Sequence, residues 1–348
     1  MIRSNASPAA SRSLELKLMH HYTALTSKTF SDSKAEEFAW QVDVPTIAYD
    51  AGYLMDAILA VSALHLRALN PTDQSIVRAS HGYMASALAQ YSNLLKDGVS
   101  ELNAEALFST AALIAFQSSA SRQFEAFDGE YALPLSWFHS FQGIKTLVMA
   151  SWHWLRHSNK VYPIISGQPA LRLDLDPERI SFFAPLLDGM DDQLALECET
   201  TRSDTKQAYE HAVAYLNWAH QRPDRGRILG FAATVSRRFV ELIGQQDPRT
   251  LVIVSCFFAM TKVADDVWWL HGAAAREVMG IYSLLPEEWW EKMEWPLRVS
   301  NYEGLIPDDV WGVSSAVKQE QQHEQKINDD IDMLAELMNR NAPPMEVD

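Results

Sequence analysis

Cysteine is scarce in this chain of 348 residues, which contains only Cys198 and Cys256. Two cysteines so far apart cannot form the disulfide framework of a small secreted protein, nor the ligand set of a cysteine-rich zinc module. We therefore expect a protein of a reducing compartment. Cys256 falls within an apolar helical segment, where a thiol would be buried and unreactive.

Long apolar runs are also missing. The longest, 251–260, has about half the length that a membrane-spanning helix needs, so we interpret it as a buried core helix. The first residues, MIRSNASPAASRS, contain no apolar stretch and are not expected to act as a secretory signal. The sequence therefore predicts no membrane span.

Basic side chains are outnumbered, because 29 lysines and arginines stand against 45 acidic residues, a formal net charge of −16. Such a charge repels a phosphate backbone and lacks the basic surface of a nucleic-acid-binding domain. We therefore expect that this chain does not hold DNA by itself.

Common catalytic motifs are absent as well, since there is no G-x-S-x-G nucleophile motif and no Gly-rich phosphate loop. Two acidic segments keep an alternative open, an all-α magnesium-dependent enzyme resembling terpene cyclases. They are the pair Asp265 and Asp266, and the set Asn328, Asp332 and Glu336 at four-residue spacing. The pair lacks a third acid, and Asp332 stands where a hydroxyl is expected. We therefore assign no catalytic residue and no metal ligand.

Helical periodicity is abundant. Hydrophobic residues make up 47% and charged residues 21%, an ordinary balance for a globular protein. Apolar residues recur every three or four positions over 137–155, and 46–69 is apolar almost all round until Asn70 and Pro71 end it. About ten such segments and no convincing strand predict an all-α fold, a single large multi-helix domain around one apolar core.

Composition divides the chain into three parts. Residues 1–13, rich in serine and alanine, are predicted to be a flexible leader, and 14–300 to be the all-helical domain. Residues 301–348 comprise a polar linker, an amphipathic helix and a tail. That helix has only a thin apolar stripe, so it could pack on the domain, mediate self-association or fray.

Several segments, taken in order, resemble the C-terminal regulatory domain of fungal zinc binuclear cluster (Zn2Cys6) transcription factors, of the sterol uptake control type. Near the N-terminus the resemblance rests on LELKLMHHYTALTSKTFS, on Trp40, on Pro45 and on the helix that ends in Ser-Ala-Leu-His-Leu at 62–66. In the C-terminal half it rests on Pro248 before an apolar helix, on Trp268, Trp269 and Gly272, and on Trp295 and Pro296. The resemblance covers about residues 14–300.

The resemblance implies an all-α regulatory domain that forms a homodimer. It also implies a protein located in the nucleus and the cytoplasm. In the sterol-responsive members such a domain holds a sterol in an apolar pocket and controls an attached DNA-binding module. The family's zinc cluster needs six cysteines near the N-terminus, and this chain has none before Cys198. No cofactor is expected except zinc in a missing N-terminal cluster. An excised domain, a lost exon and a protein without its own DNA contact all stay open.

Two apolar segments supply candidates for the wall of a hydrophobic ligand pocket. His65 is the one histidine in an otherwise apolar helix, so its ring could make a polar contact inside a cavity; a core histidine bonded to a neighbour is the alternative. Gly272 is expected to allow close helix approach where a side chain would collide. The candidate ligand-binding residues are Leu54, Ile58, His65, Phe258, Met260, Trp268, Trp269 and Gly272. Ordinary core packing is the alternative for each.

Three function classes stay open at this point. The first is a transcription regulator, or its regulatory domain, that controls a sterol, lipid or secondary-metabolite pathway and binds a hydrophobic molecule such as a sterol. The second is the magnesium-dependent enzyme, and the third a helical interaction protein that acts without DNA contact. The resemblance favours the first and predicts that the chain is not an enzyme.

Overall fold

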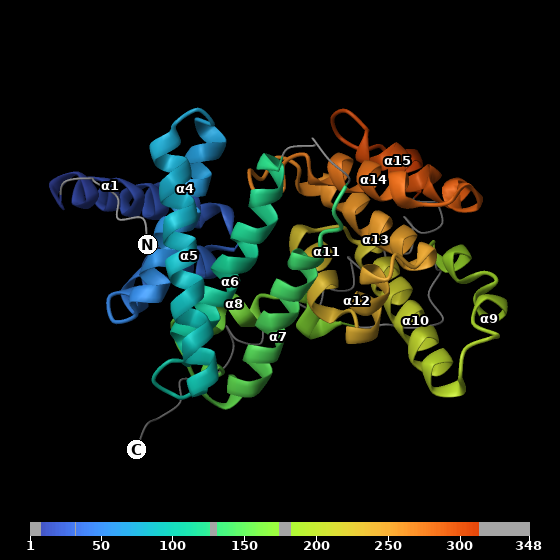
Figure 1. The fold of residues 1–348 in the computed structure, drawn as a ribbon, viewed down its shortest axis with the longest axis horizontal. Helices are drawn as coiled ribbons and strands as arrows, with labels where there is room; N and C mark the ends of the chain where they lie inside the picture. The colour runs from blue at the N-terminus through green and yellow to red at the C-terminus, as the bar shows by residue number, and fades with distance from the viewer. Residues whose placement is uncertain (1–7, 32, 126–130, 174–181, 313–348) are drawn as a thin grey trace, which may run out of the picture. The chain divides into compact units, whose positions relative to one another are not determined.

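The computed structural model describes residues 8–31, 33–125, 131–173 and 182–312. Within these ranges every regular element is a helix, which confirms the predicted all-α fold (Figure 1). The α-helices are α1 (Pro8–His21), α2 (Lys34–Phe38), α3 (Val44–Ala48), α4 (Gly52–Leu69), α5 (Gln74–Asp97), α6 (Ala104–Ser121), α7 (Leu135–Leu155), α8 (Tyr162–Ser166), α9 (Met190–Gln193), α10 (Glu199–Gln221), α11 (Arg225–Thr234), α12 (Arg237–Gly244), α13 (Pro248–Met260), α14 (Ala273–Leu284), α15 (Glu294–Ser300) and α16 (Asp308–Trp311). The estimate of about ten helices is too low, because several elements are short turns that apolar periodicity does not reveal.

The chain forms two compact units, residues 1–301 and 302–348. The helices α1 to α15 belong to the first unit, and α16 belongs to the second. The amphipathic helix predicted within 301–348, with Asn328, Asp332 and Glu336, lies outside the described residues. The division into leader, domain and tail stays a prediction.

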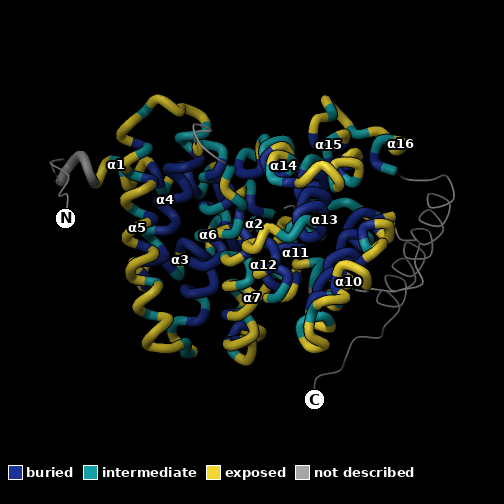
Figure 2. The backbone as a smooth tube through the Cα atoms, turned by 45° about the vertical axis from the view of Figure 1, so that its right-hand side comes forward, coloured by how far each residue is buried: buried dark blue, intermediate teal, exposed yellow. Residues whose placement is uncertain are grey.

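Helix α4 packs against α1, α5 and α6 in the first unit. Its Ser62 Oγ donates to the backbone oxygen of Leu18 in α1 at 2.6 Å, and Leu18, Leu59, Ala63 and Ile76 form a buried cluster from α1, α4 and α5. Figure 2 shows most of α4 as buried, whereas the outer side of α5 is exposed. In the described residues α4 alone is long and apolar enough to cross a membrane, and its burial fits a core helix.

The apolar segment 46–69 does not form one continuous helix. Helix α3 ends at Ala48 and α4 begins at Gly52. Between them Ala51 leaves the helical conformation, with φ −132° and ψ 85°. Gly52 has a low helix propensity, and the exposed Asp50 on the other side of Ala51 favours a turn. Hydrophobic pattern alone does not report such a break, because both helices are buried.

Helix α13 confirms the prediction of a buried core helix over 251–260. Every residue from Arg249 to Met260 is buried. The carboxylate of Asp247 caps the helix by accepting from the N–H of Thr250 at 2.8 Å, and Pro248 occupies the first turn, where its missing N–H costs nothing. Helices α14 and α15 pack on it.

A buried carboxylate fastens α14 to the end of α6. Glu277 is fully buried and accepts from Arg122 Nη2 at 2.7 Å, from Tyr131 OH at 2.7 Å and from Arg276 Nε at 2.9 Å. Such partners offset the cost of removing a charge from water.

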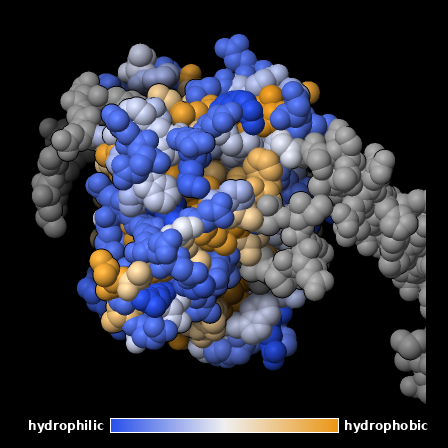
Figure 3. All heavy atoms as spheres, turned by 90° about the vertical axis from the view of Figure 1, so that its right-hand side faces the viewer, coloured by the Kyte–Doolittle hydropathy of each residue, from blue (hydrophilic) through white to orange (hydrophobic). Residues whose placement is uncertain are grey.

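The surface is mainly polar on the face seen in Figure 3. Hydrophilic side chains dominate its coloured part, and hydrophobic ones form small separate groups there.

Candidate ligand-binding site

His65 and Trp268 lie in direct contact. His65 belongs to α4 and is buried, and Trp268 belongs to the turn between the short 3-10 helix η7 (Thr261–Ala264) and α14. The two rings stack with centroids 4.5 Å apart and an interplanar angle of 11°. His65 Nδ1 lies 2.9 Å from Thr26 Oγ1, a buried hydrogen bond. The structure thus joins two residues that the sequence predicted as parts of one wall.

Burial controls the charge of His65. Burial first, and then the neighbouring His21, whose ring centroid is 4.8 Å away, lower the pKa of His65 to about 4. The pKa of His21 is lowered too, by burial first and then by the charges of His20 and Lys17. The His65 ring is therefore neutral at neutral pH, with one nitrogen that donates and one that accepts.

Thr29 is the point where the C-terminal tryptophans meet the N-terminal segment. Trp268 Nε1 donates to Thr29 Oγ1 at 3.0 Å, and Trp269 Nε1 donates to the backbone oxygen of Thr29 at 3.3 Å. Arg225 Nη1 donates to the same backbone oxygen at 2.8 Å. We call Thr26, Thr29, His65, Trp268 and Trp269 the tryptophan junction.

Aromatic rings pack behind the junction. Trp269 is 2% exposed and meets Phe116 edge to face at 4.9 Å. Phe116 stacks on Phe30 at 4.3 Å, and Trp40 packs edge to face against both of those phenylalanines. Trp40, on which the sequence resemblance partly rests, thus lies in the same aromatic group as Trp269.

Unpaired polar atoms occur beside the junction. Three buried side chains of the segment 21–27 have no hydrogen-bond partner for one atom in the described part of the chain: His21 Nε2, Tyr22 OH and Ser27 Oγ. Tyr22 and Ser27 are fully buried. Buried polar groups are normally bonded, so these three atoms are exceptions among the described residues. These atoms could not be predicted from the sequence, because the identity of a polar residue does not indicate whether it is buried.

The acidic pair in the junction turn has a structural role. Asp265 accepts from the N–H of Gly272 at 2.8 Å and from Lys262 Nζ at 3.0 Å, which closes the turn before α14. Asp266 is exposed. In the described ranges no group of three His, Cys, Asp or Glu side chains could hold a metal ion. This part of the chain therefore offers no support for the magnesium-dependent alternative.

The expected reason for Gly272 is wrong. Apart from its chain neighbours, no described residue places an atom within 4 Å of the position where a Cβ would stand, so close helix approach does not explain the glycine. Its backbone has φ +69°, a left-handed conformation that glycine adopts at little cost. Gly272 therefore lets the chain turn from the tryptophans into α14.

The other predicted residues are buried but do not all meet the junction. Leu54 and Ile58 are fully buried on α4 and precede His65 by three and two helical turns, which places them on the same stripe. Phe258 belongs to another aromatic cluster, 5.3 Å from Trp137 and 4.8 Å from Phe257. Met260 is fully buried at the end of α13.

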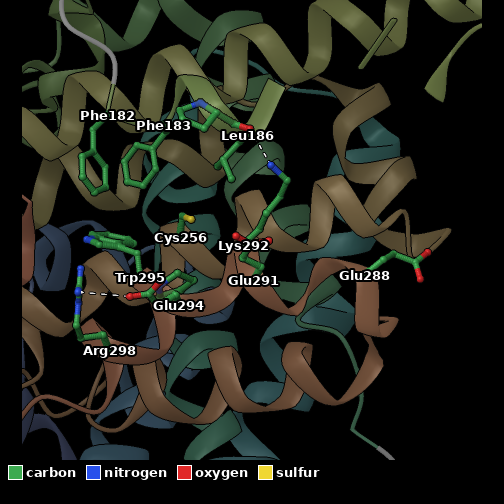
Figure 4. A pocket seen from close by; sticks show the side chains of 12 residues that line it. Phe182, Phe183, Leu186, Cys256, Glu288, Glu291, Lys292, Glu294, Trp295 and Arg298 are labelled. Carbon is green, nitrogen blue, oxygen red and sulfur yellow. Dashed lines mark hydrogen bonds and ion pairs between the residues drawn. The ribbon is translucent and has the colours of Figure 1, made fainter. Parts of the chain in front are cut away.

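A pocket of about 420 Å³ lies elsewhere in the first unit, between the short helices η6 (Ala184–Leu187) and η8 (Glu287–Met293), with α13 and α15 (Figure 4). None of the eight predicted residues lines it. Its apolar wall consists of Phe182, Phe183, Pro185, Leu186, Cys256, Trp295 and Pro296. Its charged rim consists of Glu288, Glu291, Lys292, Glu294 and Arg298. Cys256 is 2% exposed and burial raises the pKa of its thiol, as expected for an unreactive cysteine.

Known proteins similar to this chain are fungal transcription factors. No protein-family model matches the sequence. A Zn(2)-C6 fungal-type transcription factor of Gibberella zeae is 47% identical in an alignment that covers 96% of this chain and 72% of that protein. The chain belongs to the Zn(2)-C6 fungal-type transcription factors. The sequence resemblance is thereby confirmed.

More distant members of the Zn(2)-C6 group match as well. The transcription factor afumD of Aspergillus fumigatus is 28% identical, over 72% of this chain and 68% of its own length. Sterol uptake control protein 2 of Candida albicans is 26% identical over 75% of this chain, and its namesake in Saccharomyces cerevisiae is 26% identical over 74%. The matched region spans only 39% and 29% of those two sterol proteins. All four relatives are named as regulators of transcription or sterol uptake, none as an enzyme.

The zinc cluster that gives the Zn(2)-C6 group its name does not fit the residues of this chain. Two cysteines cannot replace six, and Cys198 is exposed while Cys256 is buried.

The pocket was not predicted from the sequence. The sequence resemblance rests partly on Trp295 and Pro296, but it did not indicate that they line a pocket. The facing Phe182 and Phe183 are more than a hundred residues away, so only the fold brings the two pairs together.

Proposed function

We propose that this chain is the regulatory part of a fungal transcription regulator, and that a hydrophobic molecule such as a sterol binds it to control gene expression. The match to the Zn(2)-C6 factor of Gibberella zeae carries the proposal, and the two sterol uptake control proteins favour a sterol or lipid pathway over a secondary-metabolite one. The regulator acts in the nucleus as a homodimer, with a cytoplasmic pool. DNA contact comes from a further module, attached or carried by a partner.

The ligand binds at the wall formed by α4, the end of α13 and the tryptophan junction. Leu54, Ile58 and Met260 supply fully buried apolar surface there. Each Å² of apolar ligand surface removed from water contributes about 25 cal/mol, which offsets the cost of ordering the ligand and its surroundings. The free hydroxyl of Tyr22 and the ring of His65 are suited to a single ligand hydroxyl.

Regulation follows from where the junction lies. A ligand beside Trp268 and Trp269 changes how firmly the turn before α14 is held to the N-terminal segment through Thr29. Such a ligand switches the protein only if it binds one packing of these elements more tightly than another. The junction is therefore proposed as the switching element.

Thermal denaturation with and without ergosterol tests the proposal. A ligand that binds only the folded state must raise the midpoint, by an amount that grows with ligand concentration. Tyr22→Phe should reduce the rise, while leaving the midpoint of the free protein nearly unchanged because the Tyr22 hydroxyl has no partner to lose. Tyr49→Phe is the matched control, since Tyr49 is 73% exposed. No rise at saturating ergosterol would rule out sterol binding.

A further inference from the structure

The pocket between η6 and η8 has the composition of a small-molecule site. Its volume of about 420 Å³ falls within the usual range for such sites, roughly 300 to 1,000 Å³. Figure 4 shows Phe182, Phe183 and Leu186 on one side, Trp295 and the acidic residues on the other, and Cys256 between them. All of these residues belong to the first compact unit and none to the wall proposed for a sterol.

The apolar wall is built from rings that already pack on one another. Phe183 lies edge to face with Trp295 at 5.1 Å, and Phe182 with Trp295 at 5.6 Å. Phe183 is 3% exposed, but Phe182 is 36% exposed, so an aromatic ring faces solvent at the mouth of the pocket. A flat apolar molecule that covers Phe182 would remove this ring from water.

Charge at the rim selects the polar part of the ligand. Lys292 Nζ already donates to the backbone oxygen of Pro185 at 2.9 Å, and Arg298 Nη1 lies 3.7 Å from Glu294 Oε1. Glu288 and Glu291 are exposed and make no ion pair with any described residue. Figure 4 shows Glu288 directed away from the pocket, with Glu291 nearer its centre. Glu291 is thus the lining carboxylate left to pair with a ligand.

An anionic, a neutral and a cationic ligand would interact differently with Glu291. The rim holds three carboxylates against the two cations Lys292 and Arg298, and the chain has a net charge of −16, so the overall field disfavours an anion. A neutral molecule would partly desolvate Glu291 without pairing it. A cation would form a charge-assisted hydrogen bond with Glu291.

We propose that this pocket binds an organic cation, a small molecule with a flat apolar ring system and one protonated amine. The ring system lies against Phe182, Phe183 and Leu186, and the amine pairs with Glu291. The site is separate from the sterol wall, so the chain has two binding places for small molecules of different charge.

Three probes that share one ring system test the site on the full chain: 1-naphthylmethylamine, 1-naphthalenemethanol and 1-naphthoate. Calorimetric titration at low salt should show the amine binding about five- to tenfold more tightly than the alcohol, and the acid weakest. Glu291→Gln should bring the amine to the affinity of the alcohol and leave the alcohol unchanged. Phe182→Ala should weaken both.

Glu287→Gln is the matched control, because Glu287 is exposed on the same short helix and does not line the pocket. It removes the same charge and should leave the preference for the amine nearly intact. Equal affinities for amine and alcohol would overturn the proposal. So would an equal effect of the two substitutions, or no saturable binding of any probe.

Discussion

At the residue scale, the indole of Trp268 links two different parts of the chain. Its ring face covers His65 of α4, and its Nε1 donates to Thr29 of the N-terminal segment. A hydrogen bond of this kind contributes about 0.5–1.5 kcal/mol net to stability. Two substitutions can therefore separate the hydrogen bond from the stacking. One keeps an aromatic ring at position 268 but removes its N–H, and the other removes the Thr29 hydroxyl.

Trp268→Phe should lower the free energy of unfolding by about 1 kcal/mol, because it removes the donor to Thr29 Oγ1. Thr29→Val should lower it more, because it also removes the hydrogen bond that Thr29 Oγ1 donates to the backbone oxygen of Thr26 at 2.7 Å. The double variant should cost less than the sum, since one bond is lost in both singles. Urea denaturation of the four proteins measures the coupling. Trp268→Phe combined with Tyr49→Phe is the control pair and should be additive. Strict additivity in the Thr29 pair would show that the bond is not formed.

His65 gives the folded protein a sensitivity to acid. Its pKa is lowered to about 4 in the folded state, against 6.5 for an unperturbed histidine. Between these values the unfolded chain binds the proton and the folded one does not. The free energy of unfolding should therefore fall as pH drops from about 6.5 to about 4, with this contribution complete at the lower value.

His65→Gln should make that decline shallower, although it lowers stability at neutral pH by removing the stacked ring. Denaturation midpoints in urea between pH 7 and pH 4 provide the measurement. His139→Gln is the matched control for the loss of a histidine, because His139 is exposed on α7. Parallel curves for wild type and His65→Gln would contradict the buried, neutral state of His65.

At the element scale, two helical glycines offer opposite tests of packing. Gly280 lies in α14, and a Cβ there would overlap the ring of Tyr131. Gly82 lies in α5, and no atom would come within 4 Å of its Cβ. Both helices would gain from alanine's higher helix propensity, so the difference between the two sites reports the contact alone.

Gly82→Ala should raise the free energy of unfolding by about 0.5–1 kcal/mol. Gly280→Ala should lower it by about 1–3 kcal/mol, because Tyr131 is held by Glu277 and cannot move aside without breaking that hydrogen bond. Thermal and urea denaturation measure both. A stabilised Gly280→Ala would mean that Tyr131 does not pack against α14.

Helices with one-sided or all-round apolar sequences were predictable from the chain. α13 carries its burial in its composition, since ten consecutive residues from Leu251 to Met260 include only one polar side chain. The break before Gly52 was not predictable, because apolar pattern does not encode a local change of backbone angle. The predicted role of Gly272, close helix approach, was wrong for a similar reason. A glycine in a sequence can indicate either close packing or a positive φ, and the sequence does not distinguish the two.

The candidate site was only partly readable in the sequence. His65 stood out because a histidine within an apolar helix needs a partner, and the structure supplies Thr26 and Trp268. Thr29 gave no signal, because its hydrogen bonds come from residues more than 190 positions away. The pocket at Phe182 and Trp295 escaped notice for the same reason.

At the scale of the whole molecule, net charge separates regulation from DNA contact. The chain carries a formal charge of −16, whereas DNA binding requires cations that replace the counterions of the phosphates. We therefore expect the surface of this chain to contribute no DNA affinity of its own.

The 348-residue chain should show no binding to a fluorescent DNA duplex at physiological salt in an anisotropy titration. A chimera that carries a Zn(2)-C6 module at its N-terminus should bind, and its affinity should fall steeply with added salt. The chimera with the module's cysteines changed to serine is the control and should not bind. Salt-dependent binding by the chain alone would contradict the electrostatic argument.

Thr29 also sets an order of events during synthesis. It is separated by 239 residues from Trp268 and by 240 from Trp269, the two indoles that donate to it. At about 5 to 20 residues per second, roughly 10 to 50 seconds pass between the synthesis of Thr29 and that of its partners. During this interval the N-terminal helices lack the residues that close them, and apolar rings such as Phe30 and Trp40 stay accessible to chaperones. Contacts so distant in sequence also slow folding, so the newly made regulator should mature late, after its last third has left the ribosome.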